Sequence, residues 1–376
     1  MTGSWGGFRD RLIEWGVRPT ATYDTTVLGN PTGGEKKGVK YAGLLNLYLD
    51  LDLERLLDVG GTRFMVSGSW ASGGSLSEED IGNFFPVSNI FSGRSVRLYQ
   101  LFLETKFWDK RVTVAAGRLG VADYFSTAEV FGNYVSDAFN MHPVGIDINV
   151  PAYFANPEAS WGSRMKIKPA DDFYLASGAY NSNPRVGRDS THGLDFSFRN
   201  GVILIAEAGY MPNSEEGSGG LRGGYKLGAY YDTGKFEELA NTEKSRRGNY
   251  GFYVVIDQML YREPETESEG FTAWATVTLA PEEEINTIPF FLSWGFVYEG
   301  LFPGRDEDNA AFGMAYGAVS NDLEGKDFEI ALEGTYIFQI SRWLDIQPDV
   351  QYIVHPGGSG SIPNALVVGV MLSVDL

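Results

Sequence analysis

The sequence has no cysteine, only three histidines and no long apolar run. The lack of cysteine excludes disulfide frameworks, iron–sulfur clusters and thiol chemistry. The histidines, His142, His192 and His355, share no metal-ligand or catalytic-triad spacing. No stretch reaches the roughly 18 consecutive apolar residues of a transmembrane helix. No nucleophile-elbow, phosphate-loop or dinucleotide motif lies in a strand–turn–helix context, so we predict no catalytic residue, no metal site and no cofactor.

Positive charge is also scarce, because the formal net charge is −19. Nucleic-acid binding needs basic surface, so nucleic acid is excluded as a partner. Acidic runs such as 78–80, 282–284 and 306–308 lie between strand patterns and indicate solvated loops. Binding of divalent cations among lipopolysaccharide head groups is the alternative for these runs, although no Ca²⁺ loop motif is present. Met1 leads directly into Gly3 and Ser4 with no signal peptide, so an exported protein is expected here in its mature form with an added Met.

What the sequence does contain is strict alternation of apolar and polar residues. In 326–340, Phe328, Ile330 and Leu332 fall on one face, and Glu329 and Glu333 fall on the other. The same pattern recurs in 44–54 and 343–354. Successive strand side chains point to opposite sides of a sheet, so one face meets an apolar medium and the other meets polar surroundings. Charges in the middle of such long strands are typical of a transmembrane β-barrel with an aqueous lumen. We therefore expect Leu47, Leu49, Leu332, Phe338 and Ile346 to face lipid, and Asp50, Glu329, Glu333, Gln347 and Asp349 to face the interior.

Length and composition agree with an all-β fold, an antiparallel transmembrane β-barrel of about 16 strands with a short N-terminal helix. The aromatic content of 14% suits the aromatic girdles of such barrels, and the mean hydropathy of −0.17 arises because only alternate residues face lipid. Seventeen segments alternate, although bacterial barrels have an even number of strands. The poorest patterns are 18–27 and 191–199. The candidates are 18–27, 40–54, 61–71, 94–108, 111–119, 160–168, 172–181, 191–199, 201–211, 221–232, 249–262, 270–280, 287–299, 308–319, 326–340, 343–355 and 364–375.

We predict one barrel domain, residues 17–376, preceded by an amphipathic helix within residues 1–16. Trp5, Phe8, Leu12 and Trp15 recur at helical spacing before Gly16, so this helix is expected at the periplasmic side, with its apolar residues on the inner wall or lower edge. Asn200-Gly201 predicts a tight hairpin. Long connections are predicted at about 72–93, 120–159, 212–220, 233–248 and 300–307. The loops at about 80–93 and 120–159 are expected to fold into the pore, because aromatic-rich loops of this length are rarely left in solvent.

Three stretches resemble the OprB-type carbohydrate-selective porins of Gram-negative bacteria. The first is Trp5-Gly6-Gly7-Phe8-Arg9 with Leu12 and Gly16. The second runs from Arg97-Leu98-Tyr99-Gln100-Leu101 to Ala116-Gly117-Arg118-Leu119-Gly120. The third, the most specific, is Gln347-Pro348-Asp349-Val350-Gln351-Tyr352-Ile353 with Pro356-Gly357-Gly358 and Asn364-Ala365-Leu366-Val367. With the matching order of strands, the resemblance covers nearly the whole chain.

The resemblance implies a 16-stranded barrel in the bacterial outer membrane that lets monosaccharides and related small solutes diffuse passively, without a chemical step. Its expected partners are the carbohydrate solute, outer-membrane lipid and lipopolysaccharide, and further copies of the chain in a homo-oligomer. Two alternatives stay open: a general porin for small hydrophilic solutes and ions, and a structural envelope barrel with little conductance. A soluble all-β fold, such as a propeller, and an outer-membrane hydrolase are less favoured.

Family members often carry an Arg–Glu pair at the constriction. In this sequence the acidic position falls on Asn89 and the basic position near Trp70, so we expect an amide and an aromatic to replace the pair. The chain also ends in Ser373-Val374-Asp375-Leu376 where barrels of this class usually end in Phe. Sugar recognition requires aromatic faces and planar hydrogen-bonding groups. The residues predicted to contact sugar at the constriction are Trp70, Asn89, Phe91, Arg94, Arg97, Glu104, Arg118 and Arg164. For Glu104 and Arg118, a structural ion pair in the wall is the alternative.

Overall fold

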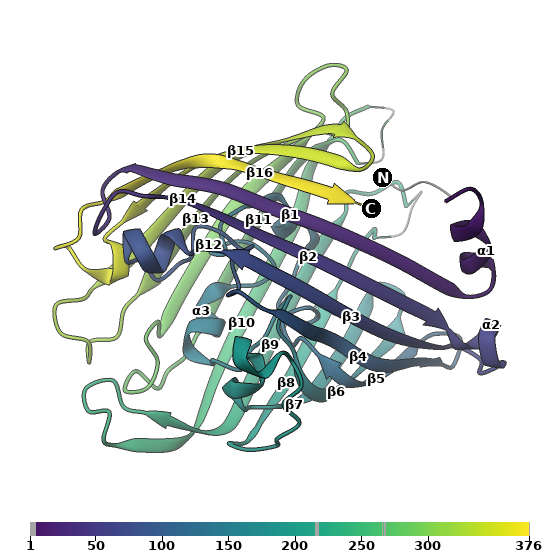
Figure 1. Ribbon diagram of the computed structural model, residues 1–376, viewed down its shortest axis with the longest axis horizontal. Helices are drawn as coiled ribbons and strands as arrows, with labels where there is room; N and C mark the ends of the chain where they lie inside the picture. Colours follow the sequence, from purple (N-terminus) through teal and green to yellow (C-terminus); the bar gives the residue numbers. More distant parts are fainter. Residues whose placement is uncertain (1–4, 215–217, 265, 267, 376) are drawn as a thin grey trace.

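The computed structural model describes residues 5–214, 218–264, 266 and 268–375. Within these residues, sixteen antiparallel strands form one closed barrel, in which each strand pairs with its sequence neighbours and β16 pairs with β1 (Figure 1). The strands are Val17–Thr32 (β1), Val39–Asp52 (β2), Thr62–Gly73 (β3), Val96–Phe107 (β4), Val112–Leu119 (β5), Ser160–Ala170 (β6), Phe173–Asn181 (β7), Val202–Tyr210 (β8), Gly223–Glu237 (β9), Ser245–Arg262 (β10), Gly270–Leu279 (β11), Phe290–Glu299 (β12), Asn309–Ala318 (β13), Phe328–Ser341 (β14), Leu344–Val354 (β15) and Ala365–Asp375 (β16). The predicted antiparallel barrel is confirmed.

The strand predicted at 191–199 is wrong. This stretch contains the end of a short 3-10 helix, Asp189–Thr191 (η4), followed by irregular chain. Asn200 does take a left-handed conformation with φ 81°, but it joins no hairpin, because the preceding segment is not a strand. The connection predicted at 233–248 is also shorter, since β9 and β10 extend to Glu237 and back to Ser245.

Each strand presents one face to the interior and one to the outside. In β14, Glu329 and Glu333 are 0% and 1% exposed, whereas Leu332 between them is partly exposed and pairs with the outward Met314 and Tyr352. Leu47 and Phe338 are exposed on the outer face, and Leu49 and Ile346 are partly exposed there. Gln347 and Asp349 of β15 are buried. The predicted orientation of the faces therefore agrees with the structure.

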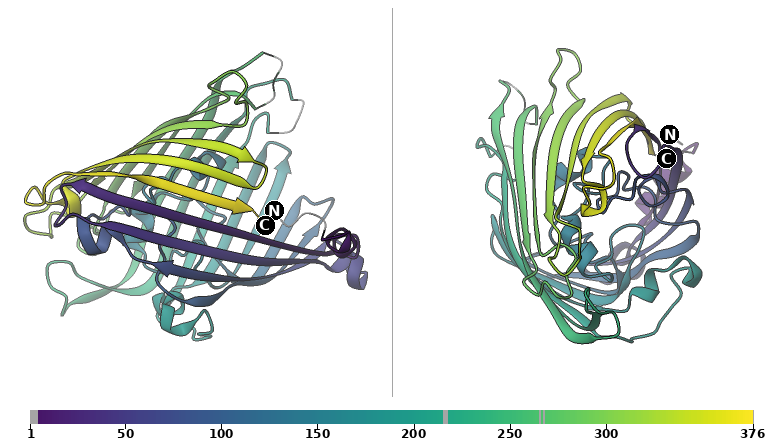
Figure 2. Two further views of the ribbon diagram at one scale, coloured as in Figure 1. Left: turned by 45° about the horizontal axis from the view of Figure 1, so that its top comes forward. Right: turned by 90° about the vertical axis from the view of Figure 1, so that its left-hand side faces the viewer.

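The two ends of the barrel differ. We call the end that holds the beginning of β1 and the end of β16 the termini end, and the opposite end the loop end (Figures 1 and 2). Two long connections from the loop end enter the barrel: the first infolded segment, residues 74–95, and the second infolded segment, residues 120–159. They carry short helices, Ser77–Ile81 (η1) in the first and Glu129–Asn133 (η2) and Val144–Asn149 (α3) in the second. Many buried apolar residues belong to these segments, including Phe85, Phe125, Phe139 and Tyr153.

The helix Phe8–Glu14 (α1) lies at the rim of the termini end and buries none of its residues. Phe8 and Trp15 are 49% and 59% exposed, so they do not pack on the inner wall as expected, and only Leu12 is partly covered. The helix is held through its C-terminal end, where the Asp52 N–H donates to the Gly16 carbonyl at 2.8 Å and Arg55 donates to the Ile13 carbonyl at 3.2 Å. A second short helix, Leu53–Leu57 (α2), follows β2 at the same rim.

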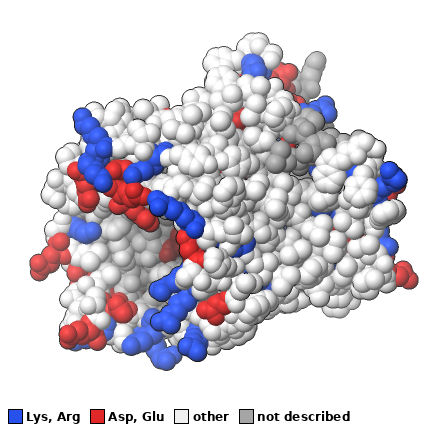
Figure 3. Space-filling model, in the orientation of Figure 1, with Lys and Arg blue, Asp and Glu red and all other residues white. Residues whose placement is uncertain are grey.

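The outer surface is mostly uncharged along the strands. In Figure 3, charged side chains gather toward the loop end and at the extreme termini end, with a wide uncharged band between them. Among the described residues, no helix combines the length and the apolar character needed to cross a bilayer.

Candidate functional site

Buried carboxylates of the inner wall bind the infolded segments. Glu329 of β14 accepts hydrogen bonds from the N–H groups of Phe84 and Phe85, both at 2.8 Å. Glu333, four residues further along β14, accepts from the N–H groups of Val135 and Ser136 at 2.7 and 3.0 Å. Irregular backbone needs acceptors when it is taken out of water. These two carboxylates therefore anchor loop backbone inside the barrel rather than facing open water.

On the neighbouring side of the barrel, Glu207 of β8 has the same role. It accepts from the Ser126 N–H at 2.9 Å and from the hydroxyls of Tyr174 and Tyr253 at 2.7 and 2.8 Å. Gln347 of β15 also binds the second infolded segment, but as a donor: its amide donates to the Asn133 carbonyl at 2.9 Å. The second infolded segment is thus fixed to strands from β8 to β15.

The inner face of β13 makes room for both infolded segments with small residues, Ala311, Gly313, Ala315 and Gly317, which are all buried. A Cβ added at Gly317 would lie 2.5 Å from Cζ of Phe85, so any larger residue would collide with the aromatic ring. The hydroxyl of Tyr134 reaches the wall nearby and donates to the Phe312 carbonyl at 2.9 Å. The inner face of β13 is therefore covered by the infolded segments, and the strands β2 to β6 lie across the barrel from it.

On that side lies a group that we call the charged cluster: Arg63, Glu104, Arg164 and Asp50. Glu104 of β4 accepts from Nε of Arg63 at 2.9 Å and from Nη2 of Arg164 at 2.9 Å. Nη1 of Arg63 also lies 3.4 Å from the Asp50 carboxylate. The register explains the meeting, because Arg63 of β3 lies directly opposite Glu104, and β5 alone separates Glu104 from Arg164 of β6. Glu104 and the Arg164 side chain are nearly buried, whereas the Arg63 side chain is 37% exposed.

Aromatic rings border the charged cluster. The Arg164 guanidinium lies 4.0 Å from the ring centre of Tyr124, which belongs to the second infolded segment. The ring of Phe102 lies 5.7 Å from both Arg63 and Arg164. Lys166, the next inward residue of β6, places its ammonium 3.9 Å over Tyr174 and 5.8 Å over Tyr124. Such cation–π contacts hold the cations in place.

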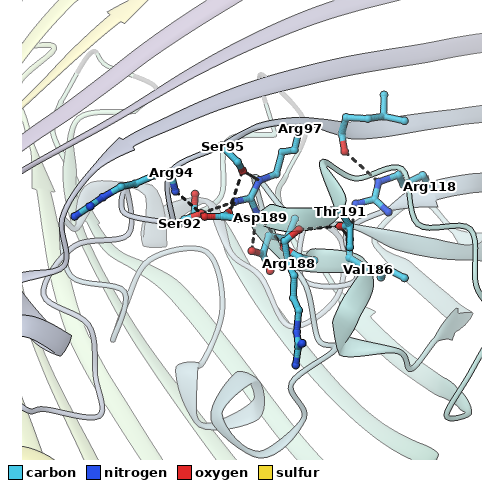
Figure 4. A network of polar contacts seen from close by, with 12 residues as sticks. Ser92, Arg94, Ser95, Arg97, Arg118, Val186, Arg188, Asp189 and Thr191 are labelled. Carbon is cyan, nitrogen blue, oxygen red and sulfur yellow. Dashed lines mark hydrogen bonds and ion pairs between the residues drawn. The ribbon is translucent and has the colours of Figure 1, made fainter.

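Arg97, at the loop end of β4, is the centre of a second network of polar contacts (Figure 4). Its guanidinium is 2% exposed and binds Glu158 at 2.6 Å, Asp189 and the Ser92 carbonyl at 2.5 Å. Asp189 also accepts from the Arg94 N–H at 2.7 Å and from the Ser95 hydroxyl at 3.0 Å. Arg97 therefore ties the connection between β7 and β8 and the second infolded segment to the wall, and its hydrogen-bonding capacity is used within the protein.

Arg118 also binds backbone within the protein. Its side chain is completely buried, and it donates to the carbonyls of Leu98 and Val186 at 3.2 and 3.3 Å (Figure 4). Glu104 takes its partners from Arg63 and Arg164, so the wall ion pair considered for Glu104 and Arg118 is not the one observed.

The remaining predicted residues lie apart from one another. Trp70 is 52% exposed and shares the outer face with its register partners Leu45 and Val96, so it does not line the lumen. Asn89 donates its N–H to the Val135 carbonyl at 3.0 Å and thereby joins the two infolded segments. The Arg94 side chain is exposed at the loop end, 3.5 Å from Glu79. Phe91 is partly buried and lines a separate cavity.

The aromatic half of the expected replacement is therefore wrong, because Trp70 faces outward, and the place of Asn89 at a constriction stays a prediction. Arg–Glu pairs are present in the interior, but Arg63 and Arg164 supply the cations. Neither Lys166 nor Arg63 was among the residues predicted from the sequence. A signal for Arg63 was available in the sequence. Arg63 is separated by even numbers of residues from the inward Ser67 and Ser69, so alternation along β3 places it on the same inner face.

The pKa values of several titratable groups in the second infolded segment are shifted by their surroundings. Burial raises the pKa of Asp123, and hydrogen bonds from the Tyr99 hydroxyl, the Asn156 N–H and the Gln100 amide oppose that rise. Burial raises the pKa of Asp137 to about 7 and lowers the pKa of His142 to about 4. Within the described part of the chain, no group of three or more His, Asp or Glu side chains is arranged to hold a metal ion.

Comparison with known proteins gives a consistent set of relatives. The family model described as carbohydrate-selective porin, OprB family, matches residues 36–376. Porin B of Pseudomonas aeruginosa is 27% identical over 418 residues, covering 99% of this chain and 90% of that protein. The putative porin QuiX of Acinetobacter baylyi is 22% identical and covers 100% of this chain and 92% of its own length.

Comparison with solved structures finds the same family of barrels. The high-pH structure of Pseudomonas putida OprB is similar with a TM-score of 0.93 at 27% identity, covering 100% of this chain and 98% of that one. The low-pH structure of Pseudomonas putida OprB has a TM-score of 0.67 at 23% identity over the same shares.

Proposed function

The chain belongs to the OprB family of carbohydrate-selective porins and is an outer-membrane carbohydrate porin, and from this premise we propose that it passes single sugar rings by diffusion along the charged cluster. It is a channel rather than an enzyme. The solutes proposed are monosaccharides and molecules of similar size. The residues proposed to contact them are Glu104, Arg164, Arg63, Lys166 and Tyr124, and the first two of these were also predicted from the sequence.

The observation that supports this site most directly is the meeting of a shared carboxylate, two guanidinium groups and an aromatic ring inside a closed barrel. Guanidinium and carboxylate groups are planar and can pair with two adjacent hydroxyls of a sugar ring. Tyr124 offers a ring for contact with the C–H face of the sugar, while Arg164 holds that ring from 4.0 Å. Arg63, with its side chain 37% exposed, is more accessible than Arg164, whose side chain is 10% exposed.

Diffusion requires that the solute also leave. A channel conducts only if binding is favourable enough for a solute to enter and weak enough for it to depart. In the charged cluster the ions already satisfy one another, so a sugar must compete with the Arg63–Glu104 and Arg164–Glu104 contacts. This competition favours weak, weakly saturable binding without an energy source.

The test is single-channel recording of the purified protein in planar bilayers, with KCl conductance measured while monosaccharide concentration is raised. Swelling of protein-containing liposomes in sugar solutions measures the flux itself. We expect a concentration-dependent fall in ion current together with sugar-driven swelling. Conductance without any effect of sugar would favour the general porin, and absence of conductance in a folded protein would favour the structural barrel.

Orientation and partners follow from the same proposal. We expect the loop end to face outward among lipopolysaccharide head groups and the termini end to face the periplasm. The uncharged band of the wall is proposed to contact the lipid of the membrane core (Figure 3). Assembly into a homo-oligomer stays a prediction from the sequence.

A further inference from the structure

A second cavity lies apart from the charged cluster, between the first infolded segment and the inner faces of β1 and β2. Its volume is about 220 Å³. The wall contributes Leu28 and Ala42, and the segment contributes Phe84, Phe91 and Ser88. No residue of the charged cluster lines it. Pockets for drug-sized ligands measure roughly 300–1,000 Å³. The space therefore suits a ligand no larger than one sugar ring.

The lining combines apolar and polar surfaces in the way an amphipathic ring requires. Phe84 and Phe91 supply aromatic surface, and the ammonium of Lys326 lies 4.5 Å over the Phe84 ring and fixes it. The polar side carries the hydroxyls of Thr26 and Ser88, which are 3.1 Å apart. Apolar walls with a few fixed polar groups are the usual construction of small-molecule sites.

Asn83 adds an unused hydrogen-bonding group. Its side chain lines the cavity, and its Oδ1 atom is buried without a hydrogen-bond partner in the protein. A buried acceptor without a donor is unfavourable, so a donor from solvent or solute is favoured at this position. A hydroxyl group of a sugar is such a donor.

The one cation in the lining, Lys40, is already neutralised. Its ammonium lies 2.6 Å from Glu79 and 3.2 Å from Asp80. The cavity thus offers no free cation to an anionic solute, and the other charged residue of its described lining is the carboxylate Glu78, in contrast to the charged cluster with its two guanidinium groups. Its chemistry favours a neutral ring with one apolar face.

We propose that this cavity is a capture subsite that binds one neutral monosaccharide near the loop end before it reaches the charged cluster. The proposal rests on the proposed function and adds a second, separate binding position to it. Phe91 supplies the aromatic face, Asn83 accepts from a hydroxyl, and the paired hydroxyls of Thr26 and Ser88 lie within the same cavity.

The test measures the block of single-channel KCl current by glucose added on each side of the bilayer in turn. Phe91→Leu keeps the apolar volume and removes the ring, Phe91→Trp restores a ring, and Phe312→Leu makes the same exchange on the outer face of β13. Loss of one aromatic contact, worth about 0.5–1.5 kcal/mol, raises the half-blocking glucose concentration roughly two- to tenfold. We expect that rise in Phe91→Leu alone, whereas the outer-face control Phe312→Leu should keep both the wild-type glucose block and the wild-type KCl conductance.

Ala42→Leu provides a second route that leaves the infolded segment intact, because it fills the cavity from the strand side. It should weaken glucose block in the same way as Phe91→Leu, and heat-modifiable mobility in gels reports whether each variant is folded. Glucose block that stays at the wild-type concentration in folded Phe91→Leu and Ala42→Leu overturns the capture subsite and leaves the proposed function standing. Absence of both glucose block and glucose-driven swelling in the wild type overturns the proposed function and the subsite together.

Discussion

Inward-facing carboxylates of the wall have two different roles at the scale of single residues. Glu104 forms ion pairs with two guanidinium groups, those of Arg63 and Arg164. Glu207, Glu329 and Glu333 accept backbone N–H groups and hold the infolded segments. The difference depends on what lies opposite each residue, because a carboxylate beside a cation forms an ion pair and a carboxylate beside bare loop backbone caps it.

Removal of the charge of Glu104 tests the first role. Glu104→Gln removes the carboxylate that pairs with both Arg63 and Arg164, so the charged cluster becomes more positive. In a KCl gradient we expect the reversal potential to shift toward the chloride equilibrium potential, whereas Glu324→Gln on an exposed connection should not move it. An unchanged reversal potential in Glu104→Gln would place Glu104 outside the ion path. Strong cation selectivity of the wild type would mean that other acidic side chains control the narrowest point.

His142 gives a pH dependence with a defined sign. It is buried, neither ring nitrogen has a hydrogen-bond partner in the protein, and burial lowers its pKa to about 4, below the ordinary 6.5. Between these values the unfolded chain binds more protons, so this group lowers the free energy of unfolding as the pH falls from about 6.5 to about 4. His142→Leu removes that loss, and its advantage over the wild type should grow by up to roughly 1.4 kcal/mol per pH unit.

Urea unfolding at pH 7 and pH 4.5 measures this difference. Asp137, whose pKa burial raises to about 7, acts in the opposite direction, but it is present in both proteins and cancels in the comparison. An advantage of the variant that is the same at both pH values would show that His142 is accessible to protons in the folded state.

At the scale of elements, the stretch 191–199 shows why local alternation can mislead. Phe196 and Phe198 alternate with polar residues and are 58% and 73% exposed. Phe196 stacks on the outward Trp161 at 5.2 Å, so this irregular chain has one apolar outer side, as a strand of the wall would. Its neighbour His192 binds the edge of β4 through its carbonyl, which accepts from the Leu98 N–H at 2.9 Å. Period-two alternation reports an apolar outer face, not a hydrogen-bonded strand.

The wall could be predicted from the sequence because each strand carries its own pattern, and all sixteen observed strands overlap a predicted one. The placement of Arg63 beside Glu104 could not be predicted from the sequence. It depends on the register between β3 and β4, and that register shifts between Val66 and Gly68. The prediction for Trp70 was wrong for a different reason, because alternation with the inward Ser69 already places Trp70 on the outer face. The position of the second infolded segment depends on contacts more than a hundred residues apart, such as Glu333 with Val135, which no local pattern contains.

The orientation of β14 has a measurable energetic consequence. Arg at the outward Leu332, near the middle of the strand, must enter the hydrocarbon region, and this costs roughly 2–4 kcal/mol at the bilayer midplane. Ile340→Arg, at the end of the same outer face, should cost about 0–1 kcal/mol. Unfolding in urea from lipid vesicles measures both. Equal costs at the two positions would contradict the placement of Leu332 in the membrane core.

The N-terminal helix contributes little to the passage. α1 lies at the rim, buries none of its residues and is joined to the barrel near Gly16 by two hydrogen bonds. Deletion of residues 1–16 should lower thermal stability slightly, because the Asp52 N–H loses its acceptor, while KCl conductance stays close to the wild-type value. A deletion variant with a much wider pore would identify the helix as a plug instead.

At the scale of the whole molecule, the second infolded segment and the charged cluster meet inside the barrel. The second infolded segment is fixed to strands from β8 to β15, and the small residues of β13 show that the wall is shaped to receive it. The charged cluster lies on β2, β3, β4 and β6, facing Tyr124 of that segment. The width and the selectivity of the channel are therefore properties of the loop and the wall together.

Replacement of residues 126–154 by a short Gly-Ser linker separates these contributions. The strands keep all their backbone pairing, and Glu207 and Glu333, which lose their loop partners, gain access to water in the wider lumen, so the barrel should still assemble. We expect a severalfold rise in KCl conductance and a weaker block by sugar, because Tyr124 loses the segment that holds it beside Arg164. The measurements are single-channel conductance, glucose block and heat-modifiable gel mobility. A folded variant with wild-type conductance would show that the passage is limited by the first infolded segment and not by the second.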